Sequence, residues 1–207
     1  MIGIIEKVLV DCLIEVGGDE LRQDVFFAAG IPADRVYRMD QHYPDAETAR
    51  LLEATLTQTQ LDAQAIFDLF TAQFFDIVEQ VFPEFLRMCS SSEDLLRKQI
   101  KIHSIMAGGC RAAEDRQQVY DKFHLVDIGP HEIQVHYKSE LQLSLLYETL
   151  MRYAAEKFGD TVVMQKIYPD PDAPDGAGGV VFHMRWTAIA GVPTELADDS
   201  SKAVAHG

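Results

Sequence analysis

The hydrophobic pattern of this chain changes beyond Cys110, and this change constrains the fold more than any other feature of the sequence. Before it, apolar residues recur every three to four positions, which is the spacing of amphipathic helices. After it come four short runs with the length and composition of strands, with one helical stretch between the second and the third. We therefore predict an α+β fold, with an amino-terminal helical lobe followed by a lobe of packed helices and a small antiparallel sheet.

Five helices are predicted in the first part of the chain, over residues 1–16, 19–30, 45–56, 62–81 and 90–106. Gly17 and Gly18 separate the first two, because glycine commonly ends a helix. Ser90 and Glu93 fit a capping box, in which the serine side chain bonds the amino terminus of the helix. The fifth helix should therefore begin at Ser90.

The second part contains predicted strands over residues 122–127, 132–137, 161–168 and 179–188, and a helix over 139–158. We expect one domain over residues 1–188, composed of a helical lobe of about residues 1–60 and an α/β lobe of about residues 61–188. The remaining residues, 189–207, have no periodicity and are predicted to form a flexible tail.

Composition excludes several classes of partner. The 207 residues carry 33 acidic against 18 basic side chains, a formal net charge of -15, which opposes binding to nucleic acid or to an anionic membrane surface. No uninterrupted apolar stretch approaches the roughly 20 residues needed to cross a bilayer. Cys12, Cys89 and Cys110 are odd in number and lack Cys-x-x-Cys spacing, which argues against zinc and favours reduced thiols in a cytoplasmic protein.

A histidine lies on the apolar face of the fifth predicted helix. Leu95, Leu96, Gln99, Ile102, His103 and Met106 fall near one stripe of that helix, and basic residues occupy the other side. His103 therefore faces inward. An inward imidazole in apolar surroundings can be the axial ligand of a haem iron. It can equally be a core histidine hydrogen-bonded to a neighbouring group, and spacing alone favours that second interpretation.

About thirty residues after His103 the chain reads Tyr137-Lys138-Ser139-Glu140-Leu141. From Met1 to about Ala188, the order of elements around these two sites and the segment Phe82-Pro83-Glu84-Phe85 resemble the haem nitric oxide/oxygen binding family (H-NOX, HNOB), which is related to the haem domain of soluble guanylate cyclase. The resemblance implies a bound haem b with His103 as the proximal iron ligand. It also implies that Tyr137 and Ser139 donate hydrogen bonds to the haem propionates.

The sequence departs from the family motif Tyr-x-Ser-x-Arg at its last position, where Leu141 replaces the arginine. An arginine paired with a carboxylate makes two charge-assisted hydrogen bonds, each worth roughly 1.5 to 3 kcal/mol where water is excluded. Their loss would lower haem affinity by about tens-fold to a thousand-fold. Cations elsewhere in the sequence that could compensate are Arg111, Arg116 and Lys122.

The resemblance also identifies residues on the gas-binding side of the haem. Family members that hold dioxygen use a tyrosine nine residues beyond the motif tyrosine, and here that position is Leu146. The next residue, Tyr147, should face about 100° away around the helix. By alignment with the family, the wall of the gas pocket is formed by Ile5, Leu9, Phe74, Val78, Leu146 and Leu150. Each of these alone could simply be a core residue. Together, a wall without a hydrogen-bond donor favours nitric oxide over dioxygen.

These observations predict a haem-based sensor for diatomic gases (NO, CO), above all nitric oxide, that signals through movement of the His103 helix. The family implies a separate histidine kinase or diguanylate cyclase as the effector. The alternative is a haem-free interaction or small-ligand-binding module with the same fold. No catalytic motif marks the chain as an enzyme. We interpret Asp170, Asp172 and Asp175 as part of a hairpin loop rather than a calcium site, and Cys110 as a bystander.

Overall fold

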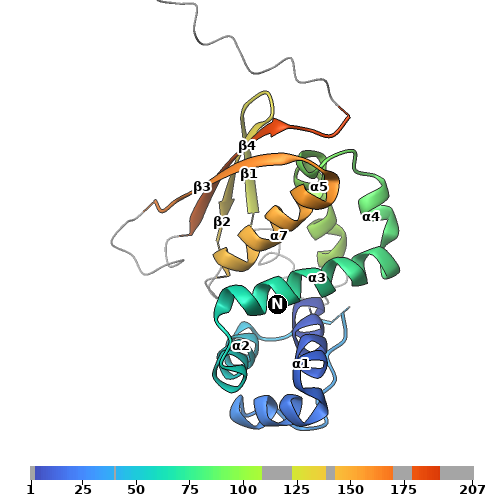
Figure 1. Ribbon diagram of the computed structural model, residues 1–207, viewed down its shortest axis with the longest axis vertical. Helices are drawn as coiled ribbons and strands as arrows, with labels where there is room; N and C mark the ends of the chain where they lie inside the picture. Colours follow the sequence, from blue (N-terminus) through green and yellow to red (C-terminus); the bar gives the residue numbers. More distant parts are fainter. Residues whose placement is uncertain (1–2, 40, 109–122, 139–142, 170–178, 192–207) are drawn as a thin grey trace, which may run out of the picture.

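The computed structural model describes residues 3–39, 41–108, 123–138, 143–169 and 179–191 (Figure 1). Along the chain the elements are α1 (Ile4–Ala28), α2 (Asp45–Thr59), α3 (Ala63–Val81), α4 (Pro83–Arg87), α5 (Ser92–Gly108), β1 (Phe123–Gly129), β2 (Glu132–Tyr137), α7 (Ser144–Phe158), β3 (Thr161–Ile167) and β4 (Val180–Ala188). The predicted α+β fold is confirmed. Within the described residues, no helix has both the length and the apolarity to span a membrane.

The first two predicted helices lie within one element, α1, and they are separated at Gly18, as the sequence predicted. The chain bends at Gly18, which has φ 70° and ψ -166°. Only glycine adopts this conformation readily, because a Cβ atom would clash with the backbone. Gly18 therefore ends the first helical segment of α1, and a second segment follows it and ends at Ala28.

The start of α5 lies slightly later than the sequence predicted. The helix begins at Ser92, and the side chain of Ser91 accepts a hydrogen bond from the Asp94 backbone N–H at 3.0 Å. In return, Asp94 Oδ2 accepts a hydrogen bond from the backbone N–H of Ser90 at 3.0 Å. The capping pair is thus Ser91 with Asp94 instead of Ser90 with Glu93, and Glu93 is left available for other contacts.

The four strands form one antiparallel sheet in the order β1-β2-β4-β3. On the two central strands, buried residues alternate with more exposed ones, as period-2 side-chain geometry requires. Ile133 pairs with Met184, and Val135 pairs with Phe182, and all four side chains are fully buried. These pairs form the part of the core against which α7 packs, and α7 lies across the sheet in Figure 1.

The amino-terminal helices and the carboxy-terminal sheet share a continuous core. The helix α3 lies between them, in contact with α1 on one side and α7 on the other (Figure 1). One cluster of buried apolar residues runs from Ile4 and Phe26 in the helical lobe to Phe182 and Trp186 on β4. Because the amino-terminal end of α1 reaches this junction, residues from the start of the chain lie beside residues from α5 and α7.

Candidate functional site

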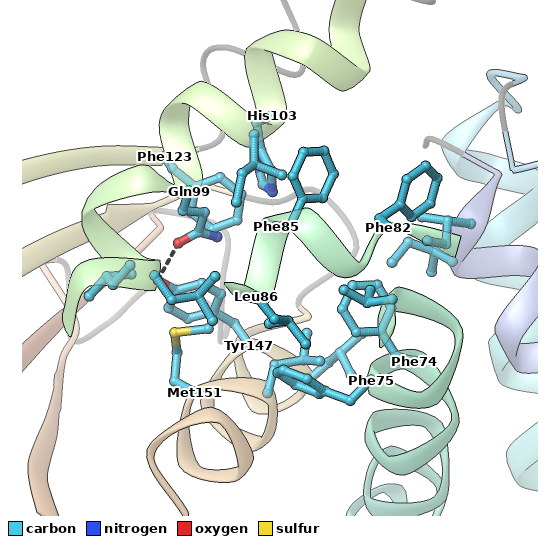
Figure 2. Close-up of a pocket in the computed structure, with 18 of the residues that line it drawn as sticks. Phe74, Phe75, Phe82, Phe85, Leu86, Gln99, His103, Phe123, Tyr147 and Met151 are labelled. Atoms are coloured by element: carbon cyan, nitrogen blue, oxygen red, sulfur yellow. Dashed lines mark hydrogen bonds between the residues drawn. The ribbon is translucent and has the colours of Figure 1, made fainter. Parts of the chain in front are cut away.

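An apolar cavity of about 210 Å³ lies where α1, α3, α4, α5 and α7 meet the β1–β2 end of the sheet (Figure 2). Nearly all the described residues that line it are apolar, including five phenylalanines: Phe74, Phe75, Phe82, Phe85 and Phe123. The polar exceptions are Gln99, His103, Tyr137 and Tyr147. A cavity of this character suits an apolar ligand, and it offers few polar groups to fix the ligand's orientation.

The imidazole of His103 lies in the wall of this cavity, as the helical stripe predicted. It follows Leu96 and Gln99 on the same face of α5, and all three line the cavity. Its Nδ1 atom is buried, and its ring contacts the edge of Phe123 with the ring centroids 4.7 Å apart. The structure thus holds an imidazole at the edge of an apolar space.

The residues predicted to form the gas-side wall come from three helices that are distant in the sequence. Ile5 of α1, Phe74 and Val78 of α3, and Leu146 and Leu150 of α7 all line the cavity. Leu9 is buried in the core one turn beyond Ile5, and it is not among the described lining residues. The structure therefore brings most of the predicted wall together opposite α5.

The expectation that Tyr147 faces away from this region is wrong. Tyr147 and Leu146 both line the cavity, because the cavity covers a broad face of α7 rather than a single row of side chains. In the sequence, this face corresponds to apolar or aromatic residues at helical spacing: Leu143, Leu146, Tyr147, Leu150 and Met151. The Tyr147 hydroxyl donates a hydrogen bond to Gln99 Oε1 at 3.1 Å, and burial raises the pKa of this tyrosine well above its usual value.

Residues 2–166 match the model of the Haem-NO-binding (HNOB) family. This chain belongs to that family. No curated protein sequence matches it.

Solved structures of H-NOX proteins have the same fold. The Fe(II) unliganded H-NOX protein from K. algicida is 17% identical with a TM-score of 0.70, and the match covers 93% of this chain and 100% of that one. An oxygen-binding H-NOX domain related to soluble guanylate cyclases, in its oxygen complex, is 14% identical with a TM-score of 0.70 over 91% of this chain and 96% of that one. A mutant of Cs H-NOX is 13% identical with a TM-score of 0.71, covering 92% and 98% respectively.

The motif residues of this H-NOX domain are described only in part. Tyr137 is the last residue of β2, is 7% exposed and lines the cavity. Its ring stacks on Tyr147 with the centroids 5.3 Å apart and the planes at 11°. Ser139 and Leu141 lie outside the described residues, as do the acidic residues at 170–175, Cys110 and the cations Arg111, Arg116 and Lys122.

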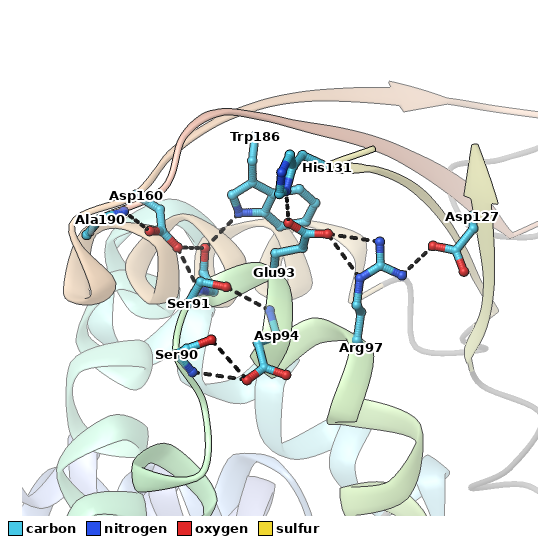
Figure 3. Close-up of polar contacts among 11 residues, drawn as sticks. Ser90, Ser91, Glu93, Asp94, Arg97, Asp127, His131, Asp160, Trp186 and Ala190 are labelled. Atoms are coloured by element: carbon cyan, nitrogen blue, oxygen red, sulfur yellow. Dashed lines mark hydrogen bonds and ion pairs between the residues drawn. The ribbon is translucent and has the colours of Figure 1, made fainter. Parts of the chain in front are cut away.

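A cluster of polar side chains, which sequence reasoning missed, fixes the amino-terminal end of α5 (Figure 3). We call it the α5 clamp, and it consists of Ser92, Glu93, His131, Asp160 and Trp186. Asp160 Oδ2 accepts hydrogen bonds from the backbone N–H and the hydroxyl of Ser92 at 2.7 and 2.6 Å. The indole N–H of Trp186 donates to Ser92 Oγ at 2.8 Å, and His131 Nδ1 lies 2.6 Å from Glu93 Oε2.

The α5 clamp ties the helix to three parts of the second lobe. Asp160 lies between α7 and β3, Trp186 lies on β4, and His131 lies in the turn between β1 and β2. Glu93 also accepts hydrogen bonds from Arg97 on the next turn of α5, at 2.9 and 3.0 Å. The helix that carries His103 is therefore fastened to the sheet at its amino-terminal end, about three turns before His103.

Proposed function

We propose that this H-NOX domain is a haem-based gas sensor that responds to nitric oxide and has no catalytic activity of its own. The observation that carries the proposal is the His103 imidazole in the wall of an apolar cavity, in a chain that belongs to the Haem-NO-binding family. The residues present fit a porphyrin: an imidazole for the iron and apolar walls for the macrocycle. Haem b, when bound, supplies an iron that takes up diatomic gases.

In this proposal His103 is the metal ligand, and Tyr137 and Ser139 hold the propionates. The position of Tyr137 on the cavity wall supports its part in this. The leucine at position 141 removes the charge that the family motif supplies, so we expect haem to bind more weakly than with an arginine there.

The selection of nitric oxide over dioxygen follows from the chemistry of the wall. Bound dioxygen is polar and is held by a hydrogen-bond donor, whereas nitric oxide bonds strongly to ferrous iron without one. Ile5, Phe74, Val78, Leu146 and Leu150 would form a wall that contains no donor. The hydroxyl of Tyr147, which also faces the cavity, is bonded to Gln99 on the His103 helix. Carbon monoxide should bind as well, since it also needs no donor.

The signal would leave the domain through α5. With haem bound, His103 would connect the gas site to α5, and α5 would change its position between two states whose populations the gas controls. A separate cytoplasmic protein, of the histidine kinase or diguanylate cyclase class, would read that change. The α5 clamp supports this direction of movement, because it holds one end of the helix and leaves the His103 end in apolar surroundings.

The proposal is tested by absorption spectroscopy of the purified protein supplied with haem. A strong Soret band that shifts when nitric oxide is added is the expected result, and His103→Ala should remove most of that band. His136→Ala, which removes an exposed imidazole from β2, is the matched control and should leave the spectrum unchanged. Chemical rescue sharpens the test: added imidazole should restore the band in His103→Gly.

The leucine at position 141, where the family motif has arginine, favours a second candidate function. This candidate is a haem-free module that binds an apolar small ligand or a protein. The missing arginine and the apolar lining of the cavity are both compatible with it. A folded protein that stays colourless in the presence of haem would overturn the sensor proposal and favour this one.

A further inference from the structure

A hydrogen bond joins two helices across the cavity wall. The hydroxyl of Tyr147 on α7 donates to Gln99 Oε1 on α5 at 3.1 Å (Figure 2). Both residues are among the polar side chains that line the cavity, and the hydroxyl hydrogen of Tyr147 is used in this contact. The contact therefore joins α5 to α7.

The Tyr147 end of this hydrogen bond is held firmly. The side chain is 4% exposed, and its ring packs against three aromatic rings of the sheet: Tyr137 at 5.3 Å, Phe123 at 5.2 Å and Phe182 at 4.9 Å between centroids. These contacts come from β2, β1 and β4. Burial also raises the pKa of Tyr147, so the hydroxyl stays protonated and remains a donor at neutral pH.

The Gln99 end moves with α5. Gln99 lies one helical turn before His103 on the same face, beyond the turn that the α5 clamp fastens to the sheet. A hydrogen bond weakens steeply when its heavy atoms separate beyond about 3.5 Å. A displacement of α5 away from α7 by less than about 1 Å would therefore break the contact at 3.1 Å.

We propose that Tyr147 and Gln99 form a latch that holds α5 in its resting position, and that Tyr147 is a positioning residue which sets how readily α5 responds to gas. The proposal rests on the sensor function proposed above. When α5 moves, the buried hydroxyl of Tyr147 and the half-buried amide of Gln99 lose this contact, which disfavours the moved state by a factor of about five. The latch thus sets a threshold that gas binding must exceed.

The test is a double-mutant cycle with Tyr147→Phe, Gln99→Met and the double variant. Phenylalanine keeps the ring stack and removes the hydroxyl, while methionine keeps the length of the glutamine and removes its amide. In the haem-free protein, the amides of α5 around Gln99 should exchange with solvent about fivefold faster in each single variant. The double variant should exchange no faster than either single variant, because both remove the same contact.

The same variants are then examined with haem and nitric oxide. The Soret position of the nitric oxide complex reports the fraction of molecules in which His103 is displaced from the iron. If this fraction is small in the wild type, it should rise about fivefold in each single variant. Tyr153→Phe is the matched control, because it removes a hydroxyl from the same helix and keeps the ring contact with Phe75 at 4.9 Å. That control should behave like the wild type in both measurements.

The outcomes separate failure of the latch from failure of the sensor. The wild type could bind haem and respond to nitric oxide while Tyr147→Phe and Gln99→Met match it in both measurements. That result would overturn the latch alone. Additive effects of the two substitutions, or an equal effect of Tyr153→Phe, would also overturn it. Absence of a Soret band in the wild type would overturn the sensor function, and with it the role of the latch in gas response.

Discussion

The two ends of α5 lie in opposite chemical surroundings. At its amino-terminal end, Ser92 and Glu93 are bonded to side chains of the second lobe by short hydrogen bonds, 2.6 to 2.8 Å long. Three turns later, His103 faces a cavity lined almost entirely by apolar side chains. Hydrogen bonds are directional and fix a position, whereas apolar contacts have little directional preference and permit displacement. One helix is thus anchored at one end and adjustable at the other.

Removing the acceptor at the centre of the α5 clamp should have the largest effect on stability. Asp160 accepts hydrogen bonds from Ser92 and from the backbone N–H of Ala190, and it is 9% exposed. Asp160→Ala leaves these buried donors unsatisfied and should lower the free energy of unfolding by about 3 kcal/mol. Urea unfolding followed by the fluorescence of Trp186, the single tryptophan, measures the change. A loss below about 1 kcal/mol would contradict the anchoring role.

A donor placed at the adjustable end should change gas selection instead of stability. Leu146→Tyr would add a hydroxyl to the cavity wall, and a hydrogen bond of about 2 kcal/mol to the bound gas would raise dioxygen affinity about thirtyfold. Oxygen titration of the haem-loaded protein tests this expectation. Leu146→Phe supplies the ring without the hydroxyl and should not raise the affinity, so an equal gain in both variants would refute the donor explanation.

Glu6 on α1 is a second buried carboxyl group, and its surroundings differ from those of Asp160. Glu6 is fully buried, and Thr48 donates a hydrogen bond to its Oε1, but Oε2 has no hydrogen-bond partner among the described residues. Burial raises the pKa of Glu6 above its ordinary value, and nearby Asp45 raises it further, while the Thr48 contact opposes the shift.

Glu6→Gln should therefore increase stability relative to the wild type as the pH rises. A raised pKa in the folded state means that the neutral Glu6 contributes its full stability below the unfolded-state pKa and loses it as the pH rises through the folded-state pKa. Glutamine stays neutral, so the difference should grow by up to about 1.4 kcal/mol per pH unit within that window. Chemical unfolding at pH values from 4 to 8 measures it, and a constant difference would contradict an ionisable Glu6.

The smallest effect is expected at the outer edge of the clamp. Asp127 forms an ion pair with Arg97, but its side chain is 73% exposed. Because water and salt screen such pairs, Asp127→Ala should change the free energy of unfolding by less than about 0.5 kcal/mol. Urea unfolding of Asp127→Ala and Asp160→Ala under the same conditions compares the stability that an exposed and a buried carboxylate contribute.

Much of the fold could be predicted from local patterns. The strands and the position of His103 on the inner face of α5 follow from hydrophobic period, because burial of one face imposes that period on the sequence. The broad cavity face of α7 was also present in the sequence, at Leu143, Leu146, Tyr147, Leu150 and Met151, although the geometry of a single pair of neighbours suggested that Tyr147 would turn away.

The sequence by itself determined which faces of the elements are apolar and in what order the elements follow. Only the tertiary structure decided which polar groups meet, since Ser92 reaches Asp160 across 68 positions and Trp186 across 94. It also decided that Ile5 lines the cavity while Leu9, one turn along the same buried face, does not. The hydrophobic period of the sequence reflects burial, which is a property of each residue by itself. Hydrogen-bond partners depend on how distant elements pack, and no local pattern contains that information.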